Sequence, residues 1–218
     1  MSWKEEAFQN FKLYAVTDFS EESPEILTKA EAAYRGGVDI LQLRSKSLSD
    51  QALYRLGKQI RLIADRYQKL FFVNDRPDLA LAVDADGVHL GQEDLPVAWV
   101  RQLFSSVGKK LWIGKSTHSL EQGRRATEEK PDYIGVGPVF KTPTKPGYQP
   151  AGLEYVRQAA KEFTIPFVAI GGIDLKNVRE VLAAGATRIA VVRAVFATSD
   201  PMEASRRLRE EIESYEYV

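Results

Sequence analysis

The feature that most constrains the fold of this chain is a regular alternation of short apolar segments with longer helical ones. Eight apolar segments have the length and residue types of strands, and sequence of helical character follows each of them. Strands that alternate with helices form a parallel sheet, because each helix returns the chain to the same edge of the sheet. The predicted strands are residues 13–16, 38–44, 70–73, 87–90, 111–114, 133–136, 166–170 and 188–192.

Eight such units in 218 residues predict a closed (β/α)8 barrel, the TIM barrel, at the small end of its size range. No linker rich in proline, glycine or serine interrupts the chain, so we expect residues 1–218 to form a single domain. Residues 1–11 carry apolar side chains on one helical face, which predicts a short N-terminal helix closing one end of the core. A loose N-terminal tail is the alternative.

An open doubly wound sheet is the alternative to the barrel. Such a sheet normally binds a nucleotide through a glycine-rich turn after its first strand. Here the first strand leads into Thr17, Asp18, Phe19 and Ser20, with no glycine. This turn favours the barrel.

Charge and composition exclude several classes of function. The 30 Lys and Arg residues balance the 30 Asp and Glu residues, which argues against a bulk nucleic-acid or membrane-surface binder. The absence of cysteine excludes thiol catalysis and disulfides, and two histidines leave little room for a zinc site. No apolar run reaches membrane-spanning length, and the first residues lack the apolar core of a signal peptide. We therefore expect a cytoplasmic protein, and a homo-oligomer is compatible with the sequence.

The segment 166–174, Pro-Phe-Val-Ala-Ile-Gly-Gly-Ile-Asp, predicts a phosphate site. Its buried strand ends at Gly171 and Gly172, whose bare backbone can turn tightly and leave N–H groups free. We expect Asp174 to cap a helix that runs to about Ala184, and a glycine turn before a helix start is a place for an anion. In a parallel barrel the usual phosphate site lies near the seventh and eighth strands. The alternative is a plain short connection.

Polar residues also gather where the other predicted strands end, at the edge where barrels carry their chemistry. Gln42, Arg44 and Lys46 alternate, so on an extended segment they point to one side. We expect them to face a partner inside the barrel mouth; the alternative is a surface ridge. The polar residues after the later strands are Asn74, Asp75, Arg76, Gln92, Asp94, Ser116, His118, Thr142, Thr144 and Lys145.

Asp75 and Asp94 end neighbouring strands, so their carboxylates can converge. Two carboxylates beside several cations suit a magnesium ion that bridges to a diphosphate, because magnesium prefers few protein oxygens plus phosphate oxygens. A pair of strand-end salt bridges is the alternative. Together with the glycine turn, two anion sites imply either two phosphorylated substrates or one long bisphosphate. Departure of a diphosphate assisted by a cation is the chemistry this arrangement favours.

These strand ends, taken in order, resemble the thiamine phosphate synthase family. The resemblance covers nearly the whole chain, and its motifs are specific in combination. It implies an enzyme in which an aminopyrimidine diphosphate loses diphosphate, leaving a methylene cation that the ring nitrogen of a thiazole phosphate, or its carboxylated form, captures. The matching segments are residues 13–18, 42–46, 74–76, 86–94, 114–118, 135–140, 142–145 and 169–173.

The resemblance also implies roles for individual residues. Arg44, Lys46, Asn74 and Lys145 would hold the diphosphate, Asp75 and Asp94 would hold Mg²⁺, and Gln42 would contact the pyrimidine. Ser116 would lie by the leaving group, so that Arg44, Lys46, Ser116 and Lys145 form the catalytic set. Thr142 and Thr144 would contact the thiazole, and Gly172 with the backbone around Val192 and Arg193 would hold its phosphate.

Two positions depart from the family pattern. Arg193 stands where a small serine is usual, and Lys141 stands where proline is common. A thiazole tautomerase of the same fold is an alternative function, although we expect that enzyme to lack the metal carboxylates. A barrel that binds thiazole phosphate as a regulator, without turnover, is a second alternative.

Overall fold

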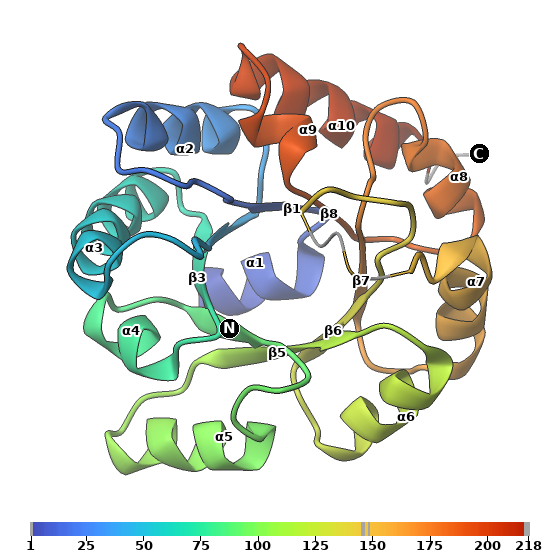
Figure 1. The fold of residues 1–218 in the computed structure, drawn as a ribbon, viewed down its shortest axis with the longest axis horizontal. Coiled ribbons are helices and arrows are strands. Elements are labelled where there is room, and N and C mark those ends of the chain that lie inside the picture. The colour runs from blue at the N-terminus through green and yellow to red at the C-terminus, as the bar shows by residue number, and fades with distance from the viewer. Residues whose placement is uncertain (1, 145–146, 148, 216–218) are drawn as a thin grey trace.

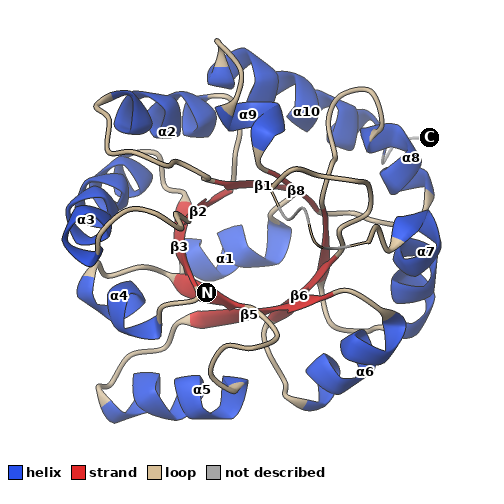
Figure 2. Cartoon of the chain, in the orientation of Figure 1, coloured by secondary structure: helices blue, strands red, loops and turns tan. Residues whose placement is uncertain are grey.

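Eight parallel strands close into a barrel in chain order, and β8 pairs with β1 to complete it (Figure 2). The structure is a computed structural model that describes residues 2–144, 147 and 149–215. The (β/α)8 barrel predicted from the alternation is confirmed. The strands are β1 Leu13–Val16, β2 Ile40–Leu43, β3 Leu70–Asn74, β4 Gly87–Leu90, β5 Trp112–Thr117, β6 Tyr133–Val136, β7 Phe167–Ile170 and β8 Ile189–Val191.

Helices surround the barrel, and one short helix lies across its opening at the N-terminal ends of the strands (Figure 1). Among the described residues, none of these helices has both the length and the apolar sequence needed to span a bilayer. The helices are α1 Trp3–Asn10, α2 Glu25–Arg35, α3 Asp50–Arg66, α4 Pro77–Ala82, α5 Val97–Ser106, α6 Leu120–Glu128, α7 Gly152–Glu162, α8 Val178–Ala183, α9 Arg193–Phe196 and α10 Pro201–Tyr215.

Helix α1 closes the lower end of the barrel, as its apolar face predicts. Ser2 and Glu5 form a reciprocal capping box that starts the helix. Phe8 then stacks on Trp112 at 4.5 Å between ring centroids, and Phe11, just after the helix, is fully buried. In the described part of the chain, α1 thus covers the N-terminal end of the barrel and leaves the C-terminal ends of the strands as its open end.

Alternation along each strand divides the side chains between the inside of the barrel and the helical layer. Tyr14, Phe72 and Tyr133 point inward and form a compact aromatic cluster above α1. The other face of each strand packs under the surrounding helices in a larger core. Tyr14 and Tyr133 of this cluster also line the cavity side of the barrel, so the cluster lies between α1 and the open end.

The segment after β7 differs from the sequence prediction. The helix expected to start at Asp174 begins at Val178, although Asp174 caps the turn that leads into it: its Oδ1 accepts from the Lys176 N–H at 2.8 Å, and its carbonyl accepts from the Val178 N–H at 2.9 Å. The side chain of Asn177 accounts for the delay: it accepts a hydrogen bond from the Asp174 N–H and donates one to the Gly172 carbonyl, both at 2.9 Å. These bonds fold residues 172–177 into turns before the helix can begin. The short helix α9, directly after β8, was not predicted.

Candidate active site

A cavity of about 490 Å³ opens at the C-terminal ends of the strands. It brings together most of the residues that the sequence singles out, although they come from six different strand ends or loops. Active sites of parallel barrels lie at this end. The predicted residues that line it are Gln42, Arg44, Asn74, Ser116, Thr142, Thr144, Gly172, Val192 and Arg193.

The end of β2 sets Arg44 firmly in the cavity wall. Arg44 is buried, its guanidinium pairs with the carboxylate of Asp18, and its backbone N–H donates to Thr17 Oγ1 at 2.8 Å. Gln42, two residues earlier, is also buried and donates from Nε2 to the hydroxyl of Tyr14 at 2.7 Å. Lys46 is exposed and is not among the lining residues, so its part in the site stays a prediction.

Asp75 and Asp94 lie next to each other beside the cavity, as their neighbouring strands predict. The pKa of Asp75 is raised to about 6, first because its carboxyl group loses solvation and then because Asp94 interacts with it. Asp94 is held in place by the Gly91 N–H, which donates to its Oδ2 at 2.6 Å. The described residues contain no group of three or more side chains able to hold a metal ion. This pair of carboxylates would therefore need oxygens from water or a ligand to complete a metal shell.

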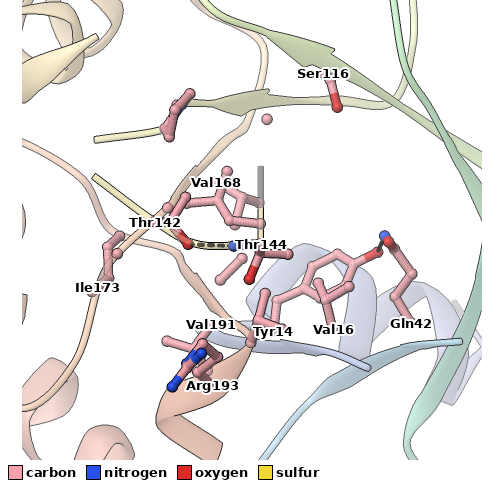
Figure 3. A pocket seen from close by; sticks show the side chains of 18 of the residues that line it. Tyr14, Val16, Gln42, Ser116, Thr142, Thr144, Val168, Ile173, Val191 and Arg193 are labelled. Atoms are coloured by element: carbon pink, nitrogen blue, oxygen red, sulfur yellow. Dashed lines mark hydrogen bonds between the residues drawn. The ribbon is translucent and has the colours of Figure 1, made fainter. Parts of the chain in front are cut away.

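Thr142 and Thr144 enter the cavity from the loop after β6 (Figure 3). The Thr144 N–H donates to Thr142 Oγ1 at 3.3 Å, which turns the loop at this point. Lys141 also lines the cavity and is exposed. Lys145, a predicted diphosphate ligand, lies outside the described residues.

The glycine turn after β7 has the conformation that the sequence predicts. Gly171 and Gly172 have φ values of +105° and +68°, which side chains other than glycine rarely adopt. A Cβ on Gly172 would lie 2.8 Å from the carbonyl oxygen of Lys141. The turn is therefore packed against the loop after β6, whose Phe140 N–H donates to the Gly171 carbonyl at 2.9 Å.

Beside this turn, β8 ends and α9 begins at Arg193. The arginine side chain is exposed at the cavity rim and makes no hydrogen bond or ion pair with another described residue (Figure 3). A glycine turn after the seventh strand and a short helix after the eighth are the usual frame of a barrel phosphate site. Arg193 adds a planar cation to that frame.

Comparison with known proteins identifies the family. A profile described as thiamine monophosphate synthase matches residues 13–195, which is most of the chain. The chain belongs to the thiamine monophosphate synthase family. The resemblance noted from the strand ends is thereby confirmed.

Two bacterial members of the thiamine monophosphate synthase family illustrate the similarity. The chain is 50% identical over 200 residues to a thiamine-phosphate synthase of Synechocystis sp., an alignment that covers 92% of this chain and 57% of the relative. It is 50% identical over 187 residues to that of Thermus thermophilus, covering 85% and 88%. The chain thus spans little more than half of the cyanobacterial relatives it matches, and most of the Thermus protein.

The fold agrees with a solved structure of the same family. A thiamine phosphate pyrophosphorylase from Pyrococcus furiosus superposes with a TM-score of 0.85 at 39% identity, covering 94% of this chain and 96% of that one. A 3-hexulose-6-phosphate synthase, at 18% identity and a TM-score of 0.66, shares only the barrel fold.

Three cavity residues of this thiamine monophosphate synthase family member were not predicted from the sequence. Tyr14, His89 and Tyr133 all line the cavity, and each lies within a strand. The predicted site residues, by contrast, stand out as polar groups toward the C-terminal ends of the strands. The alternation of side chains within β1, β4 and β6, taken together with the polar ends of those side chains, was the signal that could have found these three residues.

Proposed function

We propose that this protein is a thiamine phosphate synthase. It would join 4-amino-2-methyl-5-hydroxymethylpyrimidine diphosphate to 4-methyl-5-(2-hydroxyethyl)thiazole phosphate, or to its carboxylated form, with release of diphosphate. One observation carries the proposal: a single cavity has Arg44 and Asn74 on one wall and the glycine turn with Arg193 on another. Two phosphorylated substrates can therefore bind in the same space.

The residues on the first wall suit the departure of diphosphate. Arg44 is held in place by Asp18, and Asn74 and Ser116 offer further hydrogen-bond donors toward the cavity. Donors fixed in advance stabilise the charge that grows on a leaving group without reorganising at that moment. Lys46 and Lys145 would add positive charge to the same diphosphate.

The carboxylates of Asp75 and Asp94 fit a magnesium ion at the edge of this wall. Two acid groups this close together disfavour each other's ionised form, as the raised pKa of Asp75 shows, and a divalent cation would relieve that repulsion. When bound, Mg²⁺ would neutralise diphosphate charge. Asp75 and Asp94 would hold it, and phosphate oxygens and water would supply the remaining ligands.

The other wall would hold the second substrate in reach of the first. The Gly171–Gly172 turn and the start of α9 would take the thiazole phosphate, and Thr142 and Thr144 would contact the thiazole ring. Apolar side chains such as Val168 and Ile170 also line the cavity. A largely apolar centre limits the access of water, which would otherwise compete for the methylene cation.

An assay with the purified protein tests the proposal. Both heterocyclic substrates are mixed with Mg²⁺, and thiamine phosphate and free diphosphate are measured over time. Equal amounts of the two products are expected. Isomerisation of the thiazole substrate without condensation would indicate a tautomerase, and binding of thiazole phosphate with no turnover would indicate a regulator. Cytoplasmic location, a homo-oligomer and the absence of nucleic-acid and membrane partners remain predictions.

A further inference from the structure

Five side chains form a continuous series of hydrogen bonds across the underside of the cavity. Gln42 Nε2 donates to the Tyr14 hydroxyl at 2.7 Å, and that hydroxyl lies 3.0 Å from the hydroxyl of Tyr133. The Tyr133 hydroxyl lies 2.9 Å from His89 Nδ1, and His89 Nε2 lies 2.9 Å from Ser116 Oγ. We call these five residues the floor network. Figure 3 shows its two ends, with Gln42 beside Tyr14 and Ser116 on another strand.

The middle of the floor network is shielded from water. Tyr14 and Tyr133 are only 2% and 1% exposed, and burial raises the pKa of both phenols well above the ordinary value. Both side chains therefore stay neutral, and each carries one hydroxyl proton. Gly114 keeps the space open, because a Cβ there would lie 2.3 Å from Tyr133 Cζ and 2.5 Å from His89 Nδ1.

Each hydroxyl of the floor network carries one proton, and a neutral imidazole carries one proton on its two nitrogens. If every proton is used within the network, the hydrogen bonds can donate along it in only two directions. In the first, Gln42 donates to Tyr14, Tyr14 to Tyr133, Tyr133 to His89 Nδ1, and His89 Nε2–H to Ser116. In the second, the series runs the other way, from Ser116 to His89, Tyr133 and Tyr14, and the Gln42 amide is turned so that Oε1 accepts from Tyr14. The orientation of the Gln42 amide, with Nε2 toward Tyr14, corresponds to the first direction.

The first direction fixes what both ends of the network offer to a ligand. Gln42 Oε1 is left as an acceptor at the cavity wall. Ser116 accepts from His89, so its own hydroxyl proton is free to be donated into the cavity. An exocyclic amino group needs an acceptor, and a diphosphate oxygen needs a donor. Both ends therefore match one molecule that carries both groups.

We propose that Tyr14, Tyr133 and His89 are positioning residues that hold the floor network in this direction. Through it, they present Gln42 as an acceptor to the amino group of the pyrimidine and Ser116 as a donor to the departing diphosphate. The proposal rests on the proposed function for the identity of that substrate. The direction of the network itself is a property of the protein alone.

Nitrogen NMR of the protein without ligands tests the direction. The chain has only two histidines, and both can be labelled with ¹⁵N. His118 Nδ1 lies 2.5 Å from the Gly137 carbonyl, which can only accept, so that ring must carry a proton on Nδ1. His89 is expected to carry its proton on Nε2, giving two opposite tautomers in one spectrum. A proton on Nδ1 of His89 in the neutral ring would overturn the proposal.

Kinetics of Tyr133→Phe test the positioning role. The substitution keeps the ring and removes the hydroxyl that donates to His89. It should lower kcat about tenfold, the effect of one hydrogen bond, with a smaller effect on the KM for the pyrimidine. Tyr14→Phe, at the Gln42 end, should mainly raise that KM. Identical effects of the two variants on both constants would indicate a structural role and overturn the proposal.

A double variant shows whether Tyr133 acts through Ser116. In the Ser116→Ala background, Tyr133→Phe should lower kcat by less than about twofold, because the group it orients is gone. An equal loss in both backgrounds would overturn the proposal. Tyr34→Phe is the matched control: this buried tyrosine donates to the Leu70 carbonyl outside the cavity, so its loss should lower stability without changing kcat.

The two sets of measurements separate this inference from the proposed function. If the unaltered protein forms no thiamine phosphate, the proposed function fails, and the tautomer of His89 still decides the direction of the network. If thiamine phosphate forms but His89 carries its proton on Nδ1, only the present inference fails.

Discussion

Asp75 is the residue whose chemistry depends most directly on its surroundings. Its pKa lies near 6 because lost solvation and the adjacent Asp94 both disfavour the charged form. Only its ionised form can bind a cation through both charge and oxygen lone pairs. Magnesium binding and the protonation of Asp75 should therefore compete.

We predict that Asp75→Asn and Asp94→Asn each reduce turnover at fixed Mg²⁺ by more than tenfold. Either change removes a negative oxygen from the metal shell and weakens the neutralisation of the leaving charge. The measurement is initial rate against Mg²⁺ concentration, with thermal melts of the same samples. Unchanged turnover in both variants would contradict the metal role and favour a tautomerase or a binding protein.

A second prediction concerns pH. In the unliganded protein the folded state holds the Asp75 proton up to about pH 6, whereas an unfolded chain releases it near 3.9. Between those values the folded state binds more protons, so stability should fall as pH rises through this window. The measurement is the Tm of the wild type and of Asp75→Asn from pH 4 to 7.5. The part of the decline in Tm that comes from Asp75 should be present in the wild type and missing from the variant. The Mg²⁺ needed for half-maximal rate should rise below about pH 6.

A third prediction concerns Arg193. Its side chain is exposed at the cavity rim, and no hydrogen bond or ion pair with another described residue directs it away from the cavity. Arg193→Ser should weaken thiazole-phosphate binding about tenfold, since hydrogen bonds between charged groups contribute roughly 1.5–3 kcal/mol. Calorimetric titration measures the affinity. Tighter binding by the variant would show that the arginine obstructs the site.

At the residue scale, the sequence predicted the strand-end residues better than the residues beneath them. Gln42, Arg44 and Ser116 were found because a polar group near the C-terminal end of an apolar strand stands out. Tyr14 and Tyr133 were not found, since an aromatic residue inside a strand has the same pattern whether it serves packing or hydrogen bonding. Only the closed barrel brings β1 and β6 near enough for their hydroxyls to meet.

At the scale of elements, the turn after β7 joins two loops into one phosphate frame. Gly172 has positive φ and lies against Lys141 and Phe140 of the loop after β6. The position of that loop, which also carries Thr142 and Thr144, therefore depends on the turn.

We predict that Gly172→Ala weakens thiazole-phosphate binding and destabilises the fold by roughly 1–3 kcal/mol. Alanine at this φ is strained, and its Cβ would lie 2.8 Å from the Lys141 carbonyl oxygen. Calorimetric titration measures the loss of binding, and thermal melts measure the loss of stability. Gly108→Ala is the control: it also has positive φ, but nothing lies within 4 Å of a Cβ there, so it should lose stability and keep affinity.

Element boundaries were predicted where local signals decide them. Ser49 caps α3, because its side chain accepts from the Ala52 N–H, and a serine directly before a helical segment is a local signal for such a cap. The helix after Asp174 starts later than expected, since the hydrogen bonds of Asn177 that hold the intervening turn depend on how the turn folds. Helix α9 is only four residues long, too short to leave a periodic pattern in the sequence.

At the scale of the whole molecule, the two ends of the barrel serve different purposes, one the candidate active site and the other stability. The open end carries the cavity, whereas the end closed by α1 carries buried ion pairs. Asp86 is the centre of one such group: its carboxylate binds Lys4 of α1 at 2.6 Å, Arg61 of α3 at 2.5 Å and the Phe71 N–H of β3 at 2.9 Å. A division of this kind is general in parallel barrels, where the N-terminal face serves stability.

This division predicts opposite outcomes for the same substitution at two aspartates. Asp86→Asn removes the negative charge that pairs with Arg61, a side chain that is only 5% exposed. The loss should lower the free energy of unfolding by about 3 kcal/mol and the Tm by roughly 6–12 °C. Its kcat at 25 °C should match the wild type, because no cavity residue moves. Asp75→Asn should leave Tm equal or higher and lose turnover. Loss of activity in Asp86→Asn at temperatures well below its melting transition would show that the two ends of the barrel are coupled.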